Sequence, residues 1–158
     1  MDALAKRVAE RLKAERGKLV TAESCTGGWA AQVATSIAGS SDWFERGFVT
    51  YSNDAKQELL GVAAATLKEH GAVSEETARE MALGALARSK GSVSLAITGI
   101  AGPTGGSAAK PVGTVCFAWA AQGVARSETR HFKGDRESVR RQSVVRALEG
   151  VIETLDGG

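Results

Sequence analysis

Segments with a strand pattern alternate with segments of helical periodicity as far as residue 98, and this alternation restricts the chain to a small set of folds. The runs at residues 18–23, 48–51 and 93–98 are typical of strands, and the last is a continuous apolar run expected of a central strand. Between them, apolar residues recur every three or four positions, as in amphipathic helices. The sequence therefore predicts helices packed on a sheet.

After residue 98 the pattern changes to two consecutive strands. Residues 112–120 and 124–132 both have strand character, and Gln122-Gly123 between them is a typical tight turn. This arrangement predicts an antiparallel hairpin, and so an α/β sandwich with a mixed sheet. An all-parallel, doubly wound sheet is less consistent with the sequence because it requires breaking the hairpin.

Good capping residues mark where several helices begin. A first helix is expected to open the chain and to end near Gly17. Ser52 or Asn53 is expected to cap a short helix, and Ser74 and Asp135 to cap two longer ones. Another helix is expected to follow the glycine pair at 27–28.

Composition excludes several classes of protein. With 158 residues, the chain is expected to form a single domain over 1–158. Its net charge of +2 and few aromatic residues argue against binding to nucleic acid or to a membrane surface. No stretch is long and apolar enough to span a bilayer, and the amphipathic, charged start does not resemble a signal peptide.

The two cysteines, Cys25 and Cys116, do not suggest a disulfide framework. A reducing compartment is the simpler interpretation, so we expect a cytoplasmic protein. No cluster of His, Cys, Asp or Glu has metal-ligand spacing, so no metal is predicted.

The segment TAESCTGGWAAQ at 21–32 is the first candidate for chemistry. It leads from a strand through a turn of small residues into a helix, so Ser24 lies where a nucleophile is exposed. Backbone amides near Thr26 and Gly27 can form an oxyanion hole in such a turn. The alternative is structural: Ser24 and Thr26 cap the helix, and the glycines permit close packing.

A nucleophilic serine needs a base. His70 and His131 each lie at the end of a predicted element, so a Ser–His–Asp triad has weak support. Lys56 is the better candidate, but a lysine acts as a base only if its pKa is well below the ordinary value. Tyr51, the single tyrosine, has a hydroxyl able to orient Lys56 or a substrate. Residue types alone favour ordinary structural roles for both residues.

Cys25 competes with Ser24 for the role of nucleophile. A thiol at the start of a helix is intrinsically reactive. Adjacent residues that leave a strand point in opposite directions, so one of the two is expected to face the site and the other the core. Because small buried cysteines are common, packing is the favoured role for Cys25.

Two further segments are suited to binding an anion. A glycine-dense loop, TGIAGPTGGSAAKP, occupies residues 98–111 after the central strand, where α/β folds bind ligands. Its candidate binding residues are Thr98, Gly99 and Gly102. Arg136 and Arg140 share one face of the last helix by their spacing. The arginines fit a phosphate clamp or a solvated helix face equally well.

Six motifs together resemble the CinA C-terminal domain family. They are TAESCTGG, AGSSDWFERGFVTYSNDAK, HGAVSEETA, TGIAGPTGG, KPVGTV and GDRESVRRQ, and they occur in the family's order over nearly the whole chain. Stand-alone members are nicotinamide-nucleotide amidohydrolases of the PncC type. The resemblance implies a three-layer α/β/α sandwich with a mixed, mostly parallel sheet that includes the C-terminal antiparallel hairpin.

The resemblance also implies an activity and a set of site residues. The activity is hydrolysis of nicotinamide mononucleotide to nicotinate mononucleotide and ammonia without a metal or organic cofactor, usually by a homodimer or higher homo-oligomer. The serine of the family's AESCTGG motif falls on Ser24, the lysine after TYSN on Lys56, and the tyrosine on Tyr51. The competing hypothesis is a competence- or damage-linked module that binds nucleotides without turning them over.

Overall fold

Five strands form one mixed sheet in the computed structural model, which describes residues 1–157. The strands are β1 (Leu19–Glu23), β2 (Phe44–Val49), β3 (Val93–Gly99), β4 (Thr114–Ala121) and β5 (Val124–His131), in the order β2-β1-β3-β4-β5. β1 pairs in parallel with β2 and β3, whereas β4 runs antiparallel to both β3 and β5. The predicted mixed sheet with its C-terminal hairpin is therefore confirmed.

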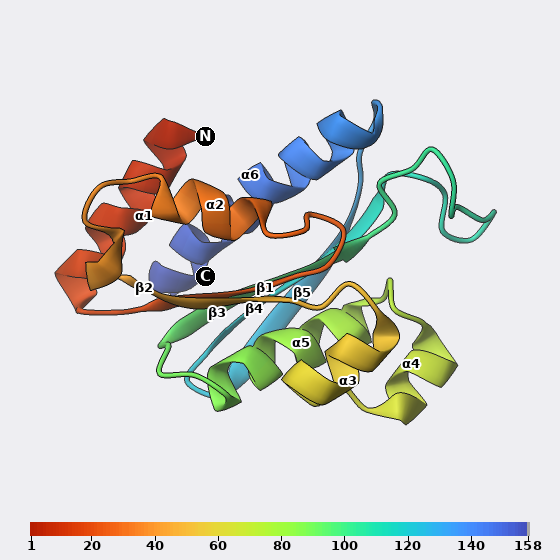
Figure 1. Ribbon diagram of the computed structural model, residues 1–158, viewed down its shortest axis with the longest axis horizontal. Coiled ribbons are helices and arrows are strands. Elements are labelled where there is room, and N and C mark those ends of the chain that lie inside the picture. Colours follow the sequence, from red (N-terminus) through yellow and green to blue (C-terminus); the bar gives the residue numbers. More distant parts are fainter. Residues whose placement is uncertain (158) are drawn as a thin grey trace.

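Helices cover both faces of the sheet, which gives the predicted three layers (Figure 1). One face carries α1 (Asp2–Glu15), α2 (Trp29–Thr35) and α6 (Arg136–Leu155). The other face carries α3 (Asn53–Leu60), α4 (Ala64–His70) and α5 (Glu75–Ala87). Within the described residues no helix combines the length and the apolar character needed to cross a membrane.

Each helical layer has its own apolar core against the sheet. On the α1, α2 and α6 side, Leu12, Trp43 and Phe117 are fully buried, and on the other side Leu60 and Met81 are. Removing this apolar surface from water is the main force that holds the three layers together. The predicted single domain of 1–158 includes one residue, 158, that lies outside the described residues.

The predicted helix caps and hairpin turn are present. The side chains of Ser52, Ser74 and Asp135 each accept a backbone hydrogen bond at the start of α3, α5 and α6. Gln122 and Gly123 both have positive φ, 54° and 78°, which is the backbone twist that suits a two-residue hairpin turn.

Two elements differ from the sequence prediction. β2 occupies Phe44–Val49 rather than residues 48–51, and its pairing with β1 has an irregularity near Leu19. As an edge strand, β2 is mostly half-buried or exposed, so it lacks the continuous apolar run that marks β3. α4 was not predicted, because only Leu67 is buried in this short helix and little periodicity results.

Candidate active site

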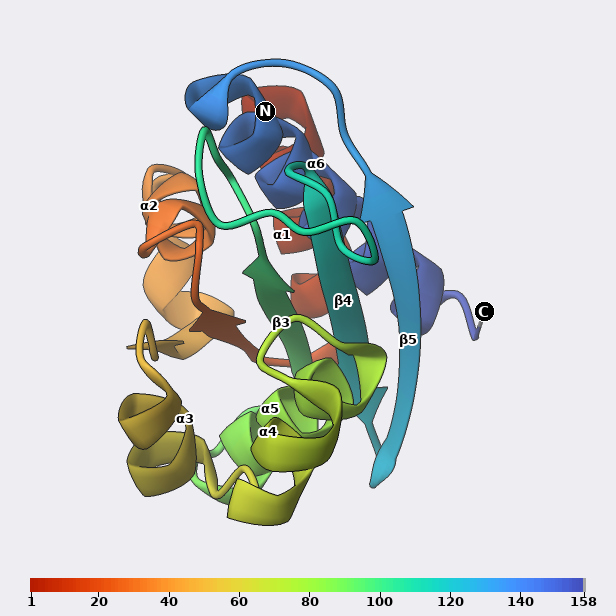
Figure 2. The ribbon, with the colours of Figure 1, turned by 90° about the vertical axis from the view of Figure 1, so that its right-hand side faces the viewer.

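The three parallel strands end at the same edge of the sheet, and the turn after β1 is held between its neighbours. The Ser24 N–H donates to Ile97 O at 3.0 Å, which ties the turn to β3. On the other side, the Thr50 N–H donates to Glu23 O at 2.8 Å, which ties it to the end of β2. Figure 2 looks onto this end of the sheet, where the loop between β3 and β4 passes in front of the strands.

Lys56 from α3 reaches Ser24 at this edge. Its Nζ donates to Ser24 Oγ at 3.2 Å and to Thr50 O at 3.0 Å. Lys56 is 1% exposed and Ser24 is 8% exposed, so the contact is almost completely shielded from water. The structure therefore brings together the two residues that were predicted to be base and nucleophile.

The surroundings of Lys56 favour its neutral form. No ion pair involves Lys56 among residues 1–157. Burial without a countercharge lowers the pKa of Lys56 from its ordinary value. A neutral amine that contacts a hydroxyl can take its proton, so this geometry is suited to general-base chemistry.

Ser24 and Cys25 face opposite sides of the sheet. Ser24 Oγ meets Lys56 on the α3 side, whereas Cys25 belongs to the apolar cluster beneath α1, α2 and α6. Burial raises the pKa of the Cys25 thiol to about 11, which leaves little thiolate at neutral pH. The arrangement agrees with the expected alternation and leaves the serine, not the cysteine, next to the lysine.

The turn from Ser24 to Gly28 leaves amides without a partner. The Gly27 N–H donates to Ser24 O at 2.9 Å, and a φ of 59° at Gly27 allows this tight turn. The N–H groups of Thr26 and Gly28 have no hydrogen-bond acceptor within the described part of the chain. Of the two amides suggested by the sequence, only that of Thr26 is therefore a free donor.

Arg136 and Arg140 contact different groups, although they lie one helical turn apart. Arg136 donates from Nη1 to Gly102 O at 2.8 Å and from Nη2 to the Tyr51 hydroxyl at 3.2 Å. Arg140 donates to the carbonyl oxygens of Cys25 and Thr26. Arg136 is exposed whereas Arg140 is half-buried, so the two residues have different opportunities to meet a ligand.

Tyr51 is 63% exposed, and its hydroxyl accepts a hydrogen bond from Arg136. Among the described residues, it makes no hydrogen bond with Lys56. A role for Tyr51 in orienting the lysine is therefore not visible in the contacts, and contact with a substrate is the remaining predicted role.

The other predicted binding residues lie along the end of β3. The Thr98 hydroxyl donates to Ala72 O at 2.8 Å, so it is already engaged by the segment between α4 and α5. Gly99 is half-buried beside β4, where an added Cβ would come within 2.8 Å of Val115. Thr98 and Gly99 thus follow Ile97, the residue that anchors Ser24.

A cavity of about 460 Å³ lies nearby but does not contain the Ser24–Lys56 pair. It is lined by residues of α5, β4 and β5 and by the segment around Lys110. The Lys110 amine donates to His70 O, and Arg79 donates to Ser127, so both cations are already engaged. Across residues 1–157, no group of three or more His, Cys, Asp or Glu could hold a metal ion.

Two residues at the site were not identified from the sequence. Glu23 is fully buried and accepts hydrogen bonds from the turn, and Thr50 supplies the second acceptor for Lys56. An acidic residue at the end of an otherwise uncharged strand was a signal for Glu23. The role of Thr50 rests on its backbone carbonyl, which no side-chain pattern reveals.

Comparison with known proteins finds one family and several relatives that match nearly the whole chain. The CinA C-terminal domain family matches residues 1–155. The nicotinamide-nucleotide amidohydrolase PncC of Escherichia coli strain K12 is 55% identical over 149 residues, which cover 92% of this chain and 89% of that protein. A protein of the same name from Pseudomonas putida is 49% identical over 150 residues, which cover 95% and 94% of the two chains.

Among solved structures, the competence/damage inducible protein CihA from Agrobacterium tumefaciens has a TM-score of 0.94 and 47% identity, covering 98% of this chain and 94% of that one. This chain belongs to the CinA C-terminal domain family. It is a homologue of the nicotinamide-nucleotide amidohydrolases named PncC.

Proposed function

We propose that this protein hydrolyses the carboxamide of nicotinamide mononucleotide to give nicotinate mononucleotide and ammonia. One observation carries the proposal: Lys56, buried and without an ion-pair partner among residues 1–157, donates to Ser24 Oγ at 3.2 Å. The amidohydrolases that are about half identical in sequence support the choice of substrate.

In the first half of the reaction, Ser24 is the nucleophile and Lys56 the base. Neutral Lys56 takes the hydroxyl proton as Ser24 Oγ attacks the carboxamide carbon. The oxygen of the resulting tetrahedral intermediate carries negative charge, which the free amides of the turn stabilise. Protonated Lys56 then gives its proton to the leaving nitrogen, so that ammonia departs and an acyl-serine remains.

The second half of the reaction uses the same groups. Lys56, neutral again, takes a proton from water as the water oxygen attacks the acyl carbon. The tetrahedral intermediate collapses, the proton returns to Ser24 Oγ, and nicotinate mononucleotide is released. In total, one water is consumed and one ammonia is formed, without a metal or organic cofactor.

The substrate's 5′-phosphate is assigned to Arg136, together with Thr98 and Gly99 at the end of β3 and the loop after them that contains Gly102. The exposed guanidinium of Arg136 already joins this loop to Tyr51, so a phosphate there would meet a cation and a hydroxyl. The phosphate lies away from the bond that breaks, so its role is to supply binding energy.

The proposal is tested by measuring ammonia release from nicotinamide mononucleotide and from nicotinamide riboside, which lacks the phosphate. The wild type should strongly prefer the phosphorylated substrate. Arg136→Ala should lower kcat/KM for it about ten- to a hundredfold, mainly through KM, and erase much of the preference. Arg141→Ala is the matched control, because Arg141 lies on the same helix and pairs with Glu137.

If the wild type releases no ammonia from either compound, the proposed activity is refuted. If it does so but Arg136→Ala keeps the full preference, the phosphate binds elsewhere. A competence- or damage-linked module without catalysis, suggested by the name of the Agrobacterium protein, would bind the nucleotide with no turnover. The intact Ser24–Lys56 contact favours the enzyme.

We place the reaction in the cytoplasm, where the free, buried thiols of Cys25 and Cys116 would stay reduced. A homodimer or higher homo-oligomer stays a prediction, which light scattering of the purified protein can check.

A further inference from the structure

A buried carboxylate holds the turn between β1 and α2 from within. Glu23 is 0% exposed, and it accepts from the Thr26 hydroxyl at 2.7 Å and from the amides of Ala30 and Ala31 at 2.8 and 3.1 Å. Gly28, which precedes α2, has no side chain that could cap the helix. Glu23 therefore fixes both the start of α2 and Thr26, in the middle of the turn.

An arginine of α6 also holds this turn, through its backbone carbonyls. Arg140 donates from Nε to Cys25 O at 3.0 Å and from Nη2 to Thr26 O at 3.1 Å. Its guanidinium also lies 5.5 Å from the centre of the Trp29 ring. The planar fork of an arginine fits two neighbouring carbonyl groups better than the single ammonium group of a lysine does. Two of its N–H groups are thus committed to the backbone of the turn.

These contacts determine which way the Thr26 amide points. The peptide bond between Cys25 and Thr26 is trans, so its C=O and N–H point in opposite directions. Because the Cys25 carbonyl faces Arg140 on the α6 side of the sheet, the Thr26 N–H faces the other side. That is the side on which Lys56 meets Ser24 Oγ, and the Thr26 N–H has no partner among residues 1–157.

We propose that Glu23 and Arg140 are positioning residues that hold the Thr26 amide as a hydrogen-bond donor to the oxyanion of amide hydrolysis. The inference rests on the proposed function and adds two residues to it. It also gives Arg140 a different task from Arg136. Arg140 acts on the turn during the chemical step, whereas Arg136 is left to bind the phosphate.

The test compares kcat and KM for Arg140→Ala, Glu23→Gln and Thr26→Val, with nicotinamide mononucleotide and nicotinamide riboside as substrates. A misplaced oxyanion donor weakens an interaction made only in the transition state, so kcat should fall on the order of ten- to a hundredfold with KM nearly unchanged. The loss should be the same for both substrates, since it does not involve the phosphate.

Two controls separate positioning from a general loss of structure. Arg141 lies 5.3 Å from the same Trp29 ring but does not contact the turn, so Arg141→Ala should retain wild-type kcat. Thr26→Ser keeps the hydroxyl that donates to Glu23, whereas Thr26→Val keeps the shape of threonine but loses the hydroxyl. Thr26→Ser should therefore be far more active than Thr26→Val. If Arg140→Ala fails to fold, Arg140→Lys, which keeps the charge but not the fork, takes its place in the comparison.

A second readout does not depend on the amide substrate. A fluorophosphonate probe labels Ser24 through a charged intermediate that needs the same donor, so the three variants should be labelled about ten- to a hundredfold more slowly than wild type. Slow labelling together with a wild type that releases no ammonia would refute the proposed substrate but keep the inference. The inference is overturned if Arg140→Ala raises KM for the phosphorylated substrate alone, or if all three variants keep wild-type kcat and labelling rate.

Discussion

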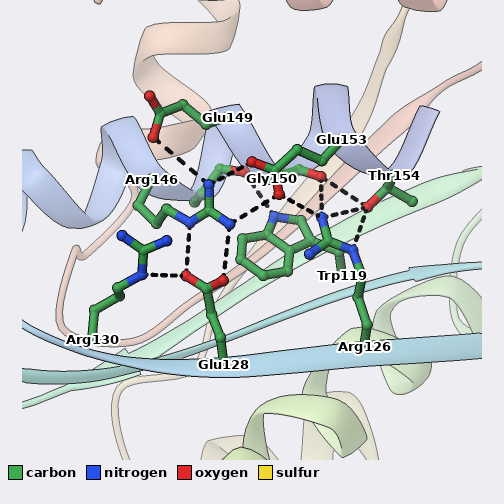
Figure 3. A network of polar contacts seen from close by, with 10 residues as sticks. Trp119, Arg126, Glu128, Arg130, Arg146, Glu149, Gly150, Glu153 and Thr154 are labelled. Atoms are coloured by element: carbon green, nitrogen blue, oxygen red, sulfur yellow. Dashed lines mark hydrogen bonds and ion pairs between the residues drawn. The ribbon is translucent and has the colours of Figure 1, made fainter. Parts of the chain in front are cut away.

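Lys56 and Arg146 are both buried basic side chains, but the chain surrounds them in opposite ways. Arg146 donates to Glu128 at 2.7 and 2.9 Å and to Glu153 at 2.7 and 3.0 Å, and it lies 5.2 Å from the centre of the Trp119 ring (Figure 3). Lys56 has no carboxylate partner among the described residues and donates only to Ser24 and to a backbone carbonyl.

The two environments move the pKa values in opposite directions. Hydrogen bonds to Glu128 and Glu153 raise the pKa of Arg146, so its charge is permanent and serves to join α6 to β5. Burial lowers the pKa of Lys56, so it loses its charge at a lower pH than an ordinary lysine does. The comparison shows two opposite environments for a buried basic side chain: the paired carboxylates stabilise the charged form of Arg146, whereas burial without a carboxylate among the described residues favours the neutral form of Lys56.

The largest expected effect comes from removing the hydroxyl that Lys56 contacts. Ser24→Ala should lose several orders of magnitude in kcat, because no nucleophile would remain beside the lysine. Cys25→Ala is the matched control and should keep most of the activity, since the thiol lies in the core on the other side of the sheet. An inactive Cys25→Ala variant that is correctly folded would instead identify the cysteine as the nucleophile.

The next largest effect comes from making Lys56 resemble Arg146. Lys56→Arg places a permanent cation at the site, and because guanidinium does not act as a base near neutral pH, kcat should fall about a thousandfold or more. Lys56→Met should be equally inactive. Its melting temperature should not fall, because the substitution removes an amine that is buried at a cost in stability.

Substantial turnover by Lys56→Arg would show that the lysine is not the base. A marked fall in the melting temperature of Lys56→Met would show that the lysine is structural, as Arg146 is.

A smaller effect, on stability rather than activity, is expected at the other cation. Arg146→Met leaves Glu128 and Glu153 in place without their main partner, and should lower the free energy of unfolding by about 2–3 kcal/mol while kcat stays unchanged. Urea denaturation and the ammonia assay measure the two quantities. An unchanged free energy of unfolding would mean that the Arg146 network does not stabilise the fold. A marked fall in kcat would mean that this network is coupled to the site around Lys56.

The same network predicts how stability depends on acid. Hydrogen bonds from Arg146 hold the pKa of Glu153 below its ordinary value of 4.5. Burial raises the pKa of Glu128, but the bonds and charge of Arg146 outweigh it, so that this pKa is lowered too. This contribution to stability is therefore complete above pH 4.5 and is lost as the pH falls through the lowered pKa values. Arg146→Met should show a weaker pH dependence in that range.

Much of the fold could be predicted because its signals are local. The apolar run of β3, the turn at Gln122-Gly123 and the capping residues Ser52 and Ser74 each act within a few residues. The edge strand β2 and the helix α4 were misplaced or missed because they bury little and show little periodicity. Their positions are set by neighbours that are distant in the sequence.

The candidate site could be predicted only in part, for a related reason. Ser24 and Lys56 were named from their motifs, but the contact between them joins residues 32 positions apart. The absence of a carboxylate beside Lys56 among the described residues, on which its proposed role as base rests, is a property of the folded surroundings. The contacts of Glu23 and Arg140 with the turn are also a property of the folded chain, since those of Arg140 depend on which way the backbone carbonyls face.

The pH dependence of kcat/KM for nicotinamide mononucleotide tests most directly whether the unpaired lysine is the base. The ordinary pKa of a lysine is 10.5, and burial lowers that of Lys56, so neutral lysine should become available below this value. We predict that kcat/KM rises with pH through an apparent pKa below 10.5 and then levels off. A kcat/KM that is flat across this range, or that rises only at or above the ordinary pKa of lysine, would contradict the account.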